Sequence, residues 1–206
     1  KIMKTRDRIL FTTLELFNEC GEPNVTTLQI ADEMDISPGN LYYHFKNKTE
    51  ILSELFNWYE KEMGEILEVP ETSLTGEDQW LFLHLIFEVI ARYQFLYQDL
   101  VNVLSRHDKL ANRFKKIINK KTKASQQICK NLAEQGILNA SDNEIEALCK
   151  SIVLTATYWI SFSTVVDGKG DDDTLNKGVY QVMTLVLPYL REAEREQLRE
   201  MGQAYL

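Results

Sequence analysis

The segment 37–45 concentrates side chains that could form hydrogen bonds to nucleic acid. Asn40 carries an amide that can pair with the edge of a base, best with an adenine. Gly39, which follows Pro38, has no side chain and would let the backbone approach DNA closely. Three further side chains can donate hydrogen bonds to phosphate oxygens: Tyr42, Tyr43 and His44. The chemistry favoured here is recognition of DNA rather than catalysis.

Two helices are expected to precede this segment. Apolar residues recur at the spacing of one helical face between Thr5 and Cys20, which predicts the first helix. Thr26 and Gln29 have the spacing of a capping box and predict a second helix from Thr27 to about Met34. We expect Leu28 to be buried on the inner face of this second helix.

The third helix is expected to be only two turns long. Ser37 is a suitable N-cap and Pro38 a suitable first residue, and the helix should end near Phe45. So short a helix is not stable alone, and we expect Leu41 and Phe45 to anchor it. Two short helices joined by a tight turn form a helix-turn-helix, whose second helix enters the major groove with its first residues at the base edges.

The residues before and after this unit could contact the DNA backbone. Thr26 and Thr27 place the start of the second helix, with its partial positive charge, beside a potential phosphate. Asn47 and Glu50 have the spacing of a cap and predict a long fourth helix. Lys48 lies at its start and could bind a phosphate as well.

The charge balance points to a small contact set. The chain has a net charge of -8, from 23 Lys and Arg against 31 Asp and Glu. Residues 1–50 hold six Lys and Arg against eight Asp and Glu, so even this segment is not basic overall. Only the placement of charge then supports DNA binding. We expect a few well-placed contacts rather than a broad basic surface.

Other classes of function find little support. His44, His84 and His107 lack ligand spacing and the three cysteines form no CxxC pair, so no metal and no cofactor is expected. No nucleophile and base lie at local spacing, so we expect no enzyme. The cysteines indicate a reducing, cytoplasmic compartment, and no secretory signal is expected. The longest uncharged run, 151–166, is shorter than the roughly 20 residues that a membrane span needs.

Residues 5–52 resemble the DNA-binding domain of the tetracycline-repressor (TetR) family. The resemblance rests on these residues: Ile9-Leu10, Leu14, Leu16-Phe17, Gly21, Val25-Thr26-Thr27, Ile30-Ala31, Ile36-Ser37-Pro38-Gly39-Asn40-Leu41-Tyr42-Tyr43-His44-Phe45, Lys46, Lys48 and Ile51-Leu52. It covers about a quarter of the chain, and the rest is similar to the family only in length and helical pattern.

This resemblance implies an all-α fold of about nine helices, a homodimer, a palindromic operator and a C-terminal pocket whose ligand loosens DNA binding. By position it implies phosphate contacts at Thr27, Tyr42, Tyr43, His44 and Lys48. It also implies base contacts at Pro38, Gly39 and Asn40. Family members usually have a more basic N-terminal domain, so affinity and salt dependence are where this chain should differ.

Aromatic residues are dense in the larger C-terminal part. A pocket needs apolar walls and a few polar groups inside. The candidate pocket residues are Trp80, His84, Phe87, Arg92, Tyr93, Tyr158 and Phe162. Packing inside the helical core is the alternative role of each of them.

Two helices expected near 144–166 and 174–190 are the candidate dimer surface. Small residues would let helices approach closely, and Ser151, Thr155 and Gly178 are candidates for this. Val182 is a further candidate for the interface. Contacts within one chain are the alternative. A dimer would place two recognition helices about 34–36 Å apart, one turn of DNA. The basic stretch 113–123 is expected to be a solvated helix face rather than a second nucleic-acid site.

Together these features predict an all-α chain with a helix-turn-helix domain over 1–47 and a helical ligand-binding and dimerisation domain over 48–206, with a polar loop at 68–76. The function expected is a repressor released from its operator by a small hydrophobic or aromatic ligand. A regulator that activates transcription or has no small ligand, and a helical scaffold that does not bind DNA, are the alternatives.

Overall fold

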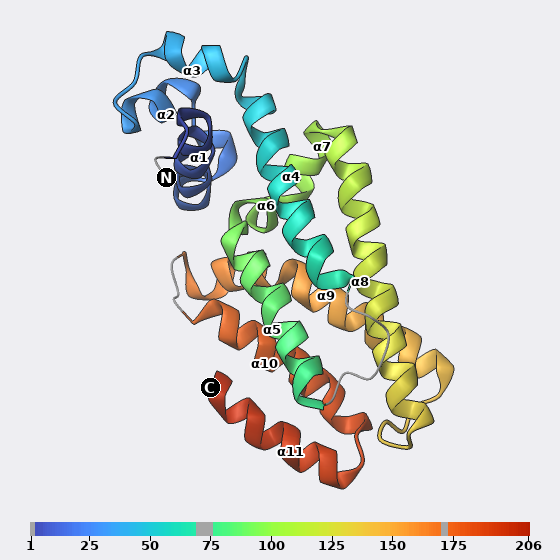
Figure 1. Ribbon diagram of the computed structural model, residues 1–206. Coiled ribbons are helices and arrows are strands. Elements are labelled where there is room, and N and C mark those ends of the chain that lie inside the picture. The colour runs from blue at the N-terminus through green and yellow to red at the C-terminus, as the bar shows by residue number, and fades with distance from the viewer. Residues whose placement is uncertain (1–2, 69–75, 170–172) are drawn as a thin grey trace.

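Helices make up the regular structure of the computed structural model, which describes residues 3–68, 76–169 and 173–206 (Figure 1). No β-strand occurs in these ranges, which confirms the all-α fold. The loop predicted at 68–76 falls mostly outside the described residues. The α-helices of the described ranges are α1 (Thr5–Cys20), α2 (Thr27–Glu33), α3 (Pro38–His44), α4 (Lys48–Leu67), α5 (Gly76–Arg92), α6 (Gln94–Gln98), α7 (Leu100–Arg106), α8 (Asp108–Glu134), α9 (Asp142–Asp167), α10 (Thr174–Val186) and α11 (Glu192–Gly202).

Side-chain caps begin helices α2, α3 and α4, where the sequence predicted them. Thr26 and Gln29 form the capping box of α2. The Ser37 hydroxyl accepts a hydrogen bond from the Asn40 backbone N–H at 3.1 Å, at the start of α3. The Asn47 side chain accepts one from the Glu50 backbone N–H at 2.9 Å, at the start of α4. These caps satisfy backbone donors that the first turn of a helix leaves free.

Helices α1, α2 and α3 form a small unit at one end of the molecule (Figure 1). Leu41 and Phe45 are fully buried and anchor α3, as predicted. They pack in a core that includes Ile9, Phe17 and Ile30. The prediction for Leu28 is wrong, because this side chain is 60% exposed. The buried face of α2 is made by Ile30 and Ala31 instead.

Helix α4 joins the small unit to the larger one. It leaves the end of α3, packs against α1, and then runs between α5 and α8 (Figure 1). Helices α9 and α10 pack against each other and complete the larger core. The boundary predicted between residues 47 and 48 falls at the first residue of α4 and stays a prediction.

The mostly apolar residues 77–97 are divided between two helices. Helix α5 ends at Arg92, and Tyr93 has φ -112° and ψ 38°, outside the helical range. Helix α6 then begins at Gln94. Tyr93 is nonetheless 1% exposed, so apolar burial continues through the break. Apolar side chains are therefore buried on both sides of the break.

Gly178 allows α10 to approach α5 and α9 closely. A Cβ atom at this position would lie 2.4 Å from Cε1 of Phe87 and 2.6 Å from Cδ1 of Trp159. Both atoms belong to rigid rings held in the core. Gly178 and Val182, which is 2% exposed, are therefore buried within one chain.

We expect Gly178→Ala to lower the free energy of unfolding by about 1–3 kcal/mol, because two aromatic rings must shift to admit the methyl group. Gly64→Ala is the matched control. Gly64 also lies inside a helix, but a Cβ there meets nothing within 4 Å. This control should raise stability by about 0.5–1 kcal/mol. Urea unfolding measures both, and equal effects would contradict the close packing at Gly178.

Candidate nucleic-acid interface and ligand cavity

The outer surface of α3 presents most of the residues predicted to contact bases and phosphates. Pro38, Gly39 and Asn40 are all exposed at its first turn. Tyr43 is 84% exposed and Tyr42 is 47% exposed. Leu41 holds the opposite side of the helix in the core. The helix therefore projects a polar and aromatic surface into solvent, as a recognition helix requires.

Tyr42 and Thr27 lie together at the edge of this surface. Their hydroxyl oxygens are 3.0 Å apart and form a hydrogen bond between α3 and the first residue of α2. His44 is half-buried, and its ring stands edge-on to that of Tyr43 at 5.1 Å between centroids. The structure thus brings four of the predicted phosphate donors to one side of the small unit.

Thr26 caps α2 as predicted, and this role occupies the hydroxyl that was also a candidate for DNA binding. Its hydroxyl accepts a hydrogen bond from the backbone N–H of Gln29 at 3.2 Å. It also lies 3.3 Å from the side-chain oxygen of Gln29, to which it donates. Because the helix cap uses the hydroxyl in both ways, Thr26 positions α2 and is not free to bind a phosphate.

The predicted phosphate contact of Lys48 is also corrected by the structure. Its ammonium donates to the backbone carbonyl oxygens of Glu22 at 2.8 Å and Val25 at 3.0 Å. It lies 3.3 Å from the Glu22 carboxylate as well. An ammonium has three donors, and these three acceptors use them all. Lys48 therefore ties α4 to the segment before α2 rather than pointing at DNA.

Glu22 is a buried acid that no pattern in the sequence singled out. Its side chain is 1% exposed and lies 2.6 Å from the guanidinium of Arg106, at the end of α7. Burial raises the pKa of the Glu22 carboxyl, but the hydrogen bond from Arg106 and the charges of Lys48 and Arg106 outweigh this, and the pKa is lowered. The three residues join the small unit to α4 and α7.

Asn18 makes a second connection between the two units. Its amide donates to the backbone carbonyl of Arg92 at 2.9 Å, and its oxygen accepts from the backbone N–H of Phe95 at 3.0 Å. These are the residues on either side of the break between α5 and α6. The Phe17 ring meets that of Phe95 at 5.2 Å. A movement at this break would therefore be transmitted directly to α1.

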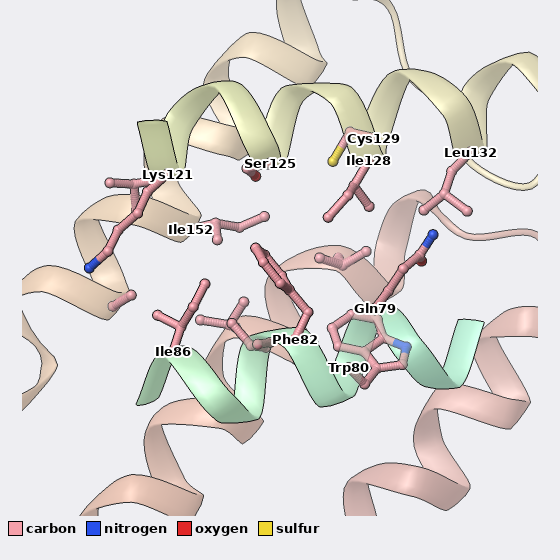
Figure 2. Close-up of a pocket in the computed structure, with 15 residues that line it drawn as sticks. Gln79, Trp80, Phe82, Ile86, Lys121, Ser125, Ile128, Cys129, Leu132 and Ile152 are labelled. Atoms are coloured by element: carbon pink, nitrogen blue, oxygen red, sulfur yellow. The ribbon is translucent and has the colours of Figure 1, made fainter. Parts of the chain in front are cut away.

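The larger unit contains an apolar cavity between α5, α8, α9 and α10. The space inside it that a water-sized sphere can reach is about 90 Å³, and the empty volume rises to about 740 Å³ when the open solvent at its mouth is included. Figure 2 shows α5 and α8 facing each other across it, with Phe82 pointing from α5 toward α8. Its polar side chains are Gln79, Lys121 and Ser125, beside the indole of Trp80 and the thiol of Cys129. This composition, apolar walls with a few polar groups, suits a small apolar ligand.

Trp80 lines the cavity, but the other predicted pocket residues do not. Phe87 packs against Gly178. His84 bonds to Glu88 at 3.0 Å and to the hydroxyl of Tyr205 at 3.2 Å. These side chains leave α5 on faces that do not line the cavity, because aromatic content alone cannot tell which face of a buried helix meets an open space.

Arg92 and Tyr93 are engaged with α4 instead of a ligand. The Arg92 guanidinium forms an ion pair with Glu62, and the Tyr93 hydroxyl donates to the same carboxylate at 2.6 Å. The predicted polar groups of the pocket therefore serve contacts between α4 and the end of α5. The cavity takes its charge from Lys121, a residue of the basic stretch that was expected to be solvated throughout.

Tyr158 and Phe162 lie on the outer face of α9, which we define as Leu154, Tyr158, Phe162 and Val165. The exposed fractions of these side chains are 60%, 42%, 56% and 85%. They recur every three or four residues and so form one stripe. The pocket prediction for Tyr158 and Phe162 is wrong, because both point away from their own chain.

Of the predicted dimer residues, two lie beside the outer face of α9 and two are buried in the core. Ser151 and Thr155 are half-buried, one turn apart, at one edge of the outer face of α9. Gly178 and Val182 are buried in the core of one chain, so neither can reach a partner. By length and hydropathy alone, α9 meets the test for a membrane span, a test that core helices also pass. In the structure it packs against α6, α8 and α10.

Lys121 lies at the junction of the cavity and the core. Its side chain is 5% exposed, and its ammonium donates to the Tyr97 hydroxyl at 3.1 Å. That hydroxyl lies 2.5 Å from the hydroxyl of Tyr59 on α4. Burial lowers the pKa of Lys121 to about 7 and raises the pKa of both tyrosines. These groups connect α8, α6 and α4 through buried polar atoms.

Comparison with protein families matches both units. Residues 9–55 match the family described as bacterial regulatory proteins, tetR family. Residues 58–198 match the family described as TetR, bacterial transcriptional repressor. The second match alone covers well over half of the chain.

Individual relatives agree with this. The regulator QacR of Staphylococcus aureus is 28% identical over 99 residues, 48% of this chain and 53% of its own length. The first curated relatives are thus matched over about half their length. The biofilm operon regulator IcaR of Staphylococcus aureus is 25% identical over 88% of this chain and 98% of its own.

The crystal structure of a TetR-family regulator from Marinobacter aquaeolei VT8 is 37% identical, covers 98% of this chain and 99% of its own, and superposes with a TM-score of 0.89. The repressor SmeT of Stenotrophomonas maltophilia shares the fold, with a TM-score of 0.64 at 16% identity.

Proposed function

Because this chain belongs to the TetR family of bacterial transcriptional regulators, we propose that it is a DNA-binding repressor that a small apolar ligand releases from a palindromic operator. The observation that carries the proposal is the outer surface of α3. It projects Asn40 and Tyr43 into solvent while Leu41 and Phe45 hold the helix in the core.

The predicted contacts divide by chemistry. Pro38, Gly39 and Asn40 would meet base edges, because they begin the helix that enters the major groove. Thr27, Tyr42, Tyr43 and His44 would donate to phosphates on the flanking backbone. With a net charge of -8, the protein depends on this small set rather than on a broad basic surface.

A homodimer is part of the proposal. The outer face of α9 exposes four large apolar side chains in one stripe, which two copies could cover by packing their α9 helices together. The pairing would bring two α3 helices to neighbouring turns of one DNA duplex. The names of QacR and SmeT describe regulators, and SmeT a repressor of an efflux pump. For this chain we propose a regulator that acts in the cytoplasm, without assigning the genes that it regulates.

Release by a ligand is supported by the cavity and by the contacts that leave it. The cavity wall includes α5 and α8, and α5 ends at the break that Asn18 holds. A ligand that moves these helices would move α1 and α4 with them. The two recognition helices would then no longer match the spacing of the operator.

Two substitutions separate base reading from phosphate contact. Asn40→Ala should change which bases are preferred, with about 1–3 kcal/mol less discrimination at one position of each half-site. Tyr43→Phe removes a single hydroxyl and should weaken binding about three- to tenfold on all sequences. Selection from a randomised DNA library, followed by titration of the selected sites, measures both effects.

Lys46→Ala and Leu28→Ala are the control substitutions for Asn40→Ala and Tyr43→Phe. Both residues are exposed on the small unit, so neither substitution should unfold it. An unchanged preference after Asn40→Ala would remove this residue from the base contacts. If the unaltered protein enriches no sequence at all, DNA binding itself is refuted. Deleting the gene should raise transcription of the target, and a fall would indicate an activator.

A further inference from the structure

Lys121 stands out from the basic stretch to which it belongs. Its neighbours Lys115, Lys116, Lys120 and Lys123 are exposed on α8, whereas Lys121 is buried and lines the cavity. An ammonium held away from water is costly unless a partner of opposite charge is present. Among the described residues no ion pair is recorded for Lys121. Its recorded hydrogen bond goes to the neutral hydroxyl of Tyr97.

The rest of the cavity wall is apolar, so the cavity carries its charge at one end. Figure 2 shows Lys121 at the opposite end of the cavity from Gln79 and Trp80, with its ammonium turned away from the middle. Ser125 lies one turn further along α8 and faces the same space. The aliphatic stem of a lysine is flexible, so the ammonium could turn toward a group placed near Ser125.

Resting on the proposed function, we propose that the ligand is an organic anion with an apolar body, such as a monocarboxylate, whose charged group pairs with Lys121. The carboxylate would accept from the Lys121 ammonium and the Ser125 hydroxyl. The apolar body would extend along Phe82, Ile86 and Leu132 toward Trp80. A neutral ligand would leave the buried ammonium without an opposite charge, and a cation would be repelled.

Pairing also affects the contacts beyond the cavity. An ammonium that turns to a carboxylate gives up its hydrogen bond to Tyr97, whose hydroxyl lies 2.5 Å from that of Tyr59 on α4. The neutral and charged forms of Lys121 are close in free energy near pH 7, since burial lowers its pKa to about 7. An anion would favour the charged form and so change the polar contacts that join α8 to α4.

The test compares acids with alcohols of the same shape. Decanoate and decan-1-ol form one pair, and 4-butylbenzoate and 4-butylbenzyl alcohol form the other. Calorimetric titration of the full-length protein at pH 7 should show at least one acid bound about tenfold or more tightly than its alcohol. Lys121→Met should abolish this preference, and Lys120→Met, an exposed neighbour, should keep it.

The melting temperature of Lys121→Met provides a second test of the proposal. Removing a buried charge without an ionic partner should raise the melting temperature of Lys121→Met by a few degrees in the absence of ligand. A lower melting temperature would mean that Lys121 serves the fold through Tyr97 and would overturn the proposal. It would also be overturned if both alcohols bind as tightly as their acids, or if neither acid binds.

Measurements of DNA binding distinguish a failure of this inference from a failure of the proposed function. The acid that binds should lower the affinity of the unaltered protein for a library-selected site. It should not change the affinity of Lys121→Met for the same site. A protein that binds the selected site but ignores both acids refutes the anion and leaves the repressor intact. A protein that binds an acid tenfold over its alcohol but enriches no DNA supports the anion site and refutes the repressor.

Discussion

Leu154→Glu should convert the protein to a monomer and lower its affinity for a palindromic site by at least about a hundredfold. Leu154 is 60% exposed at the start of the outer face of α9. In a dimer joined through this face, the new carboxylate would be buried against apolar side chains of the partner. An unpaired buried charge costs several kcal/mol, which is enough to separate most dimers.

The loss of DNA affinity follows from the loss of the partner. A dimer engages two half-sites at once, and the second contact forms at a high effective concentration. A monomer keeps its α3 surface but binds one half-site only. Sedimentation and titration of a selected site measure the two consequences independently.

Leu81→Glu is the matched control. Leu81 is 55% exposed on α5, and its substitution changes charge and hydrophobicity by the same amount. It should leave the molecular weight in solution unchanged. If Leu154→Glu remains dimeric while Leu81→Glu does not, the interface lies on α5, and the assignment of the outer face of α9 is wrong.

Glu22→Gln should lower the free energy of unfolding by about 2–3 kcal/mol. The carboxylate is buried, and its loss leaves Arg106 and Lys48 without their shared partner. Breaking a buried ion pair costs about 3–5 kcal/mol. We expect the lower end or less, because Arg106 and Lys48 are partly exposed and remain partly solvated.

The pH dependence of this difference has a definite sign. The folded-state pKa of Glu22 is lowered, so its ionised form is favoured by folding. The stabilisation is complete above the ordinary pKa of 4.5 and disappears as the pH falls through the lowered value. Urea unfolding should therefore show a large gap between the original protein and Glu22→Gln at pH 7. The gap should be much smaller at pH 3.

The titration of His107 must be kept apart from this effect. Burial and the charge of Arg106 lower the pKa of His107, whereas the Glu22 carboxylate raises it, so Glu22→Gln also changes the titration of His107. Glu54→Gln serves as the control. Glu54 pairs with Arg6 at 3.4 Å on the surface, where such pairs contribute about 0–1 kcal/mol. A gap for Glu22→Gln no larger than for Glu54→Gln would contradict the buried network.

The features that the sequence predicted correctly are local ones. Thr26 with Gln29, Ser37 with Asn40, and Asn47 with Glu50 act within one turn of helix, so their spacing is sufficient to identify them. The burial of Leu41 and Phe45 follows from the same short-range logic. The all-α fold is likewise a sum of local signals and was predicted.

The features that were missed depend on which face of a helix meets which neighbour. Lys48 turns inward because Glu22, 26 residues earlier, lies beneath it. Phe162 and Trp80 are both aromatic, yet one faces solvent and the other the cavity. Helix α9 is apolar on several faces, so its hydrophobicity does not show which face meets its own chain. The burial of Lys121 was missed because the neighbouring lysines of the same stretch are exposed.

The contacts of Asn18 and Glu22 also bear on how this regulator could be recombined with others. The small unit is fixed to the rest of the chain by side chains as well as by α4: Asn18 at the break between α5 and α6, and Glu22 at Arg106. A chimera that changed operator specificity by exchanging residues 1–47 would keep its response to ligand only if the donor supplied both residues. Recognition residues on α3 could be exchanged singly without this requirement.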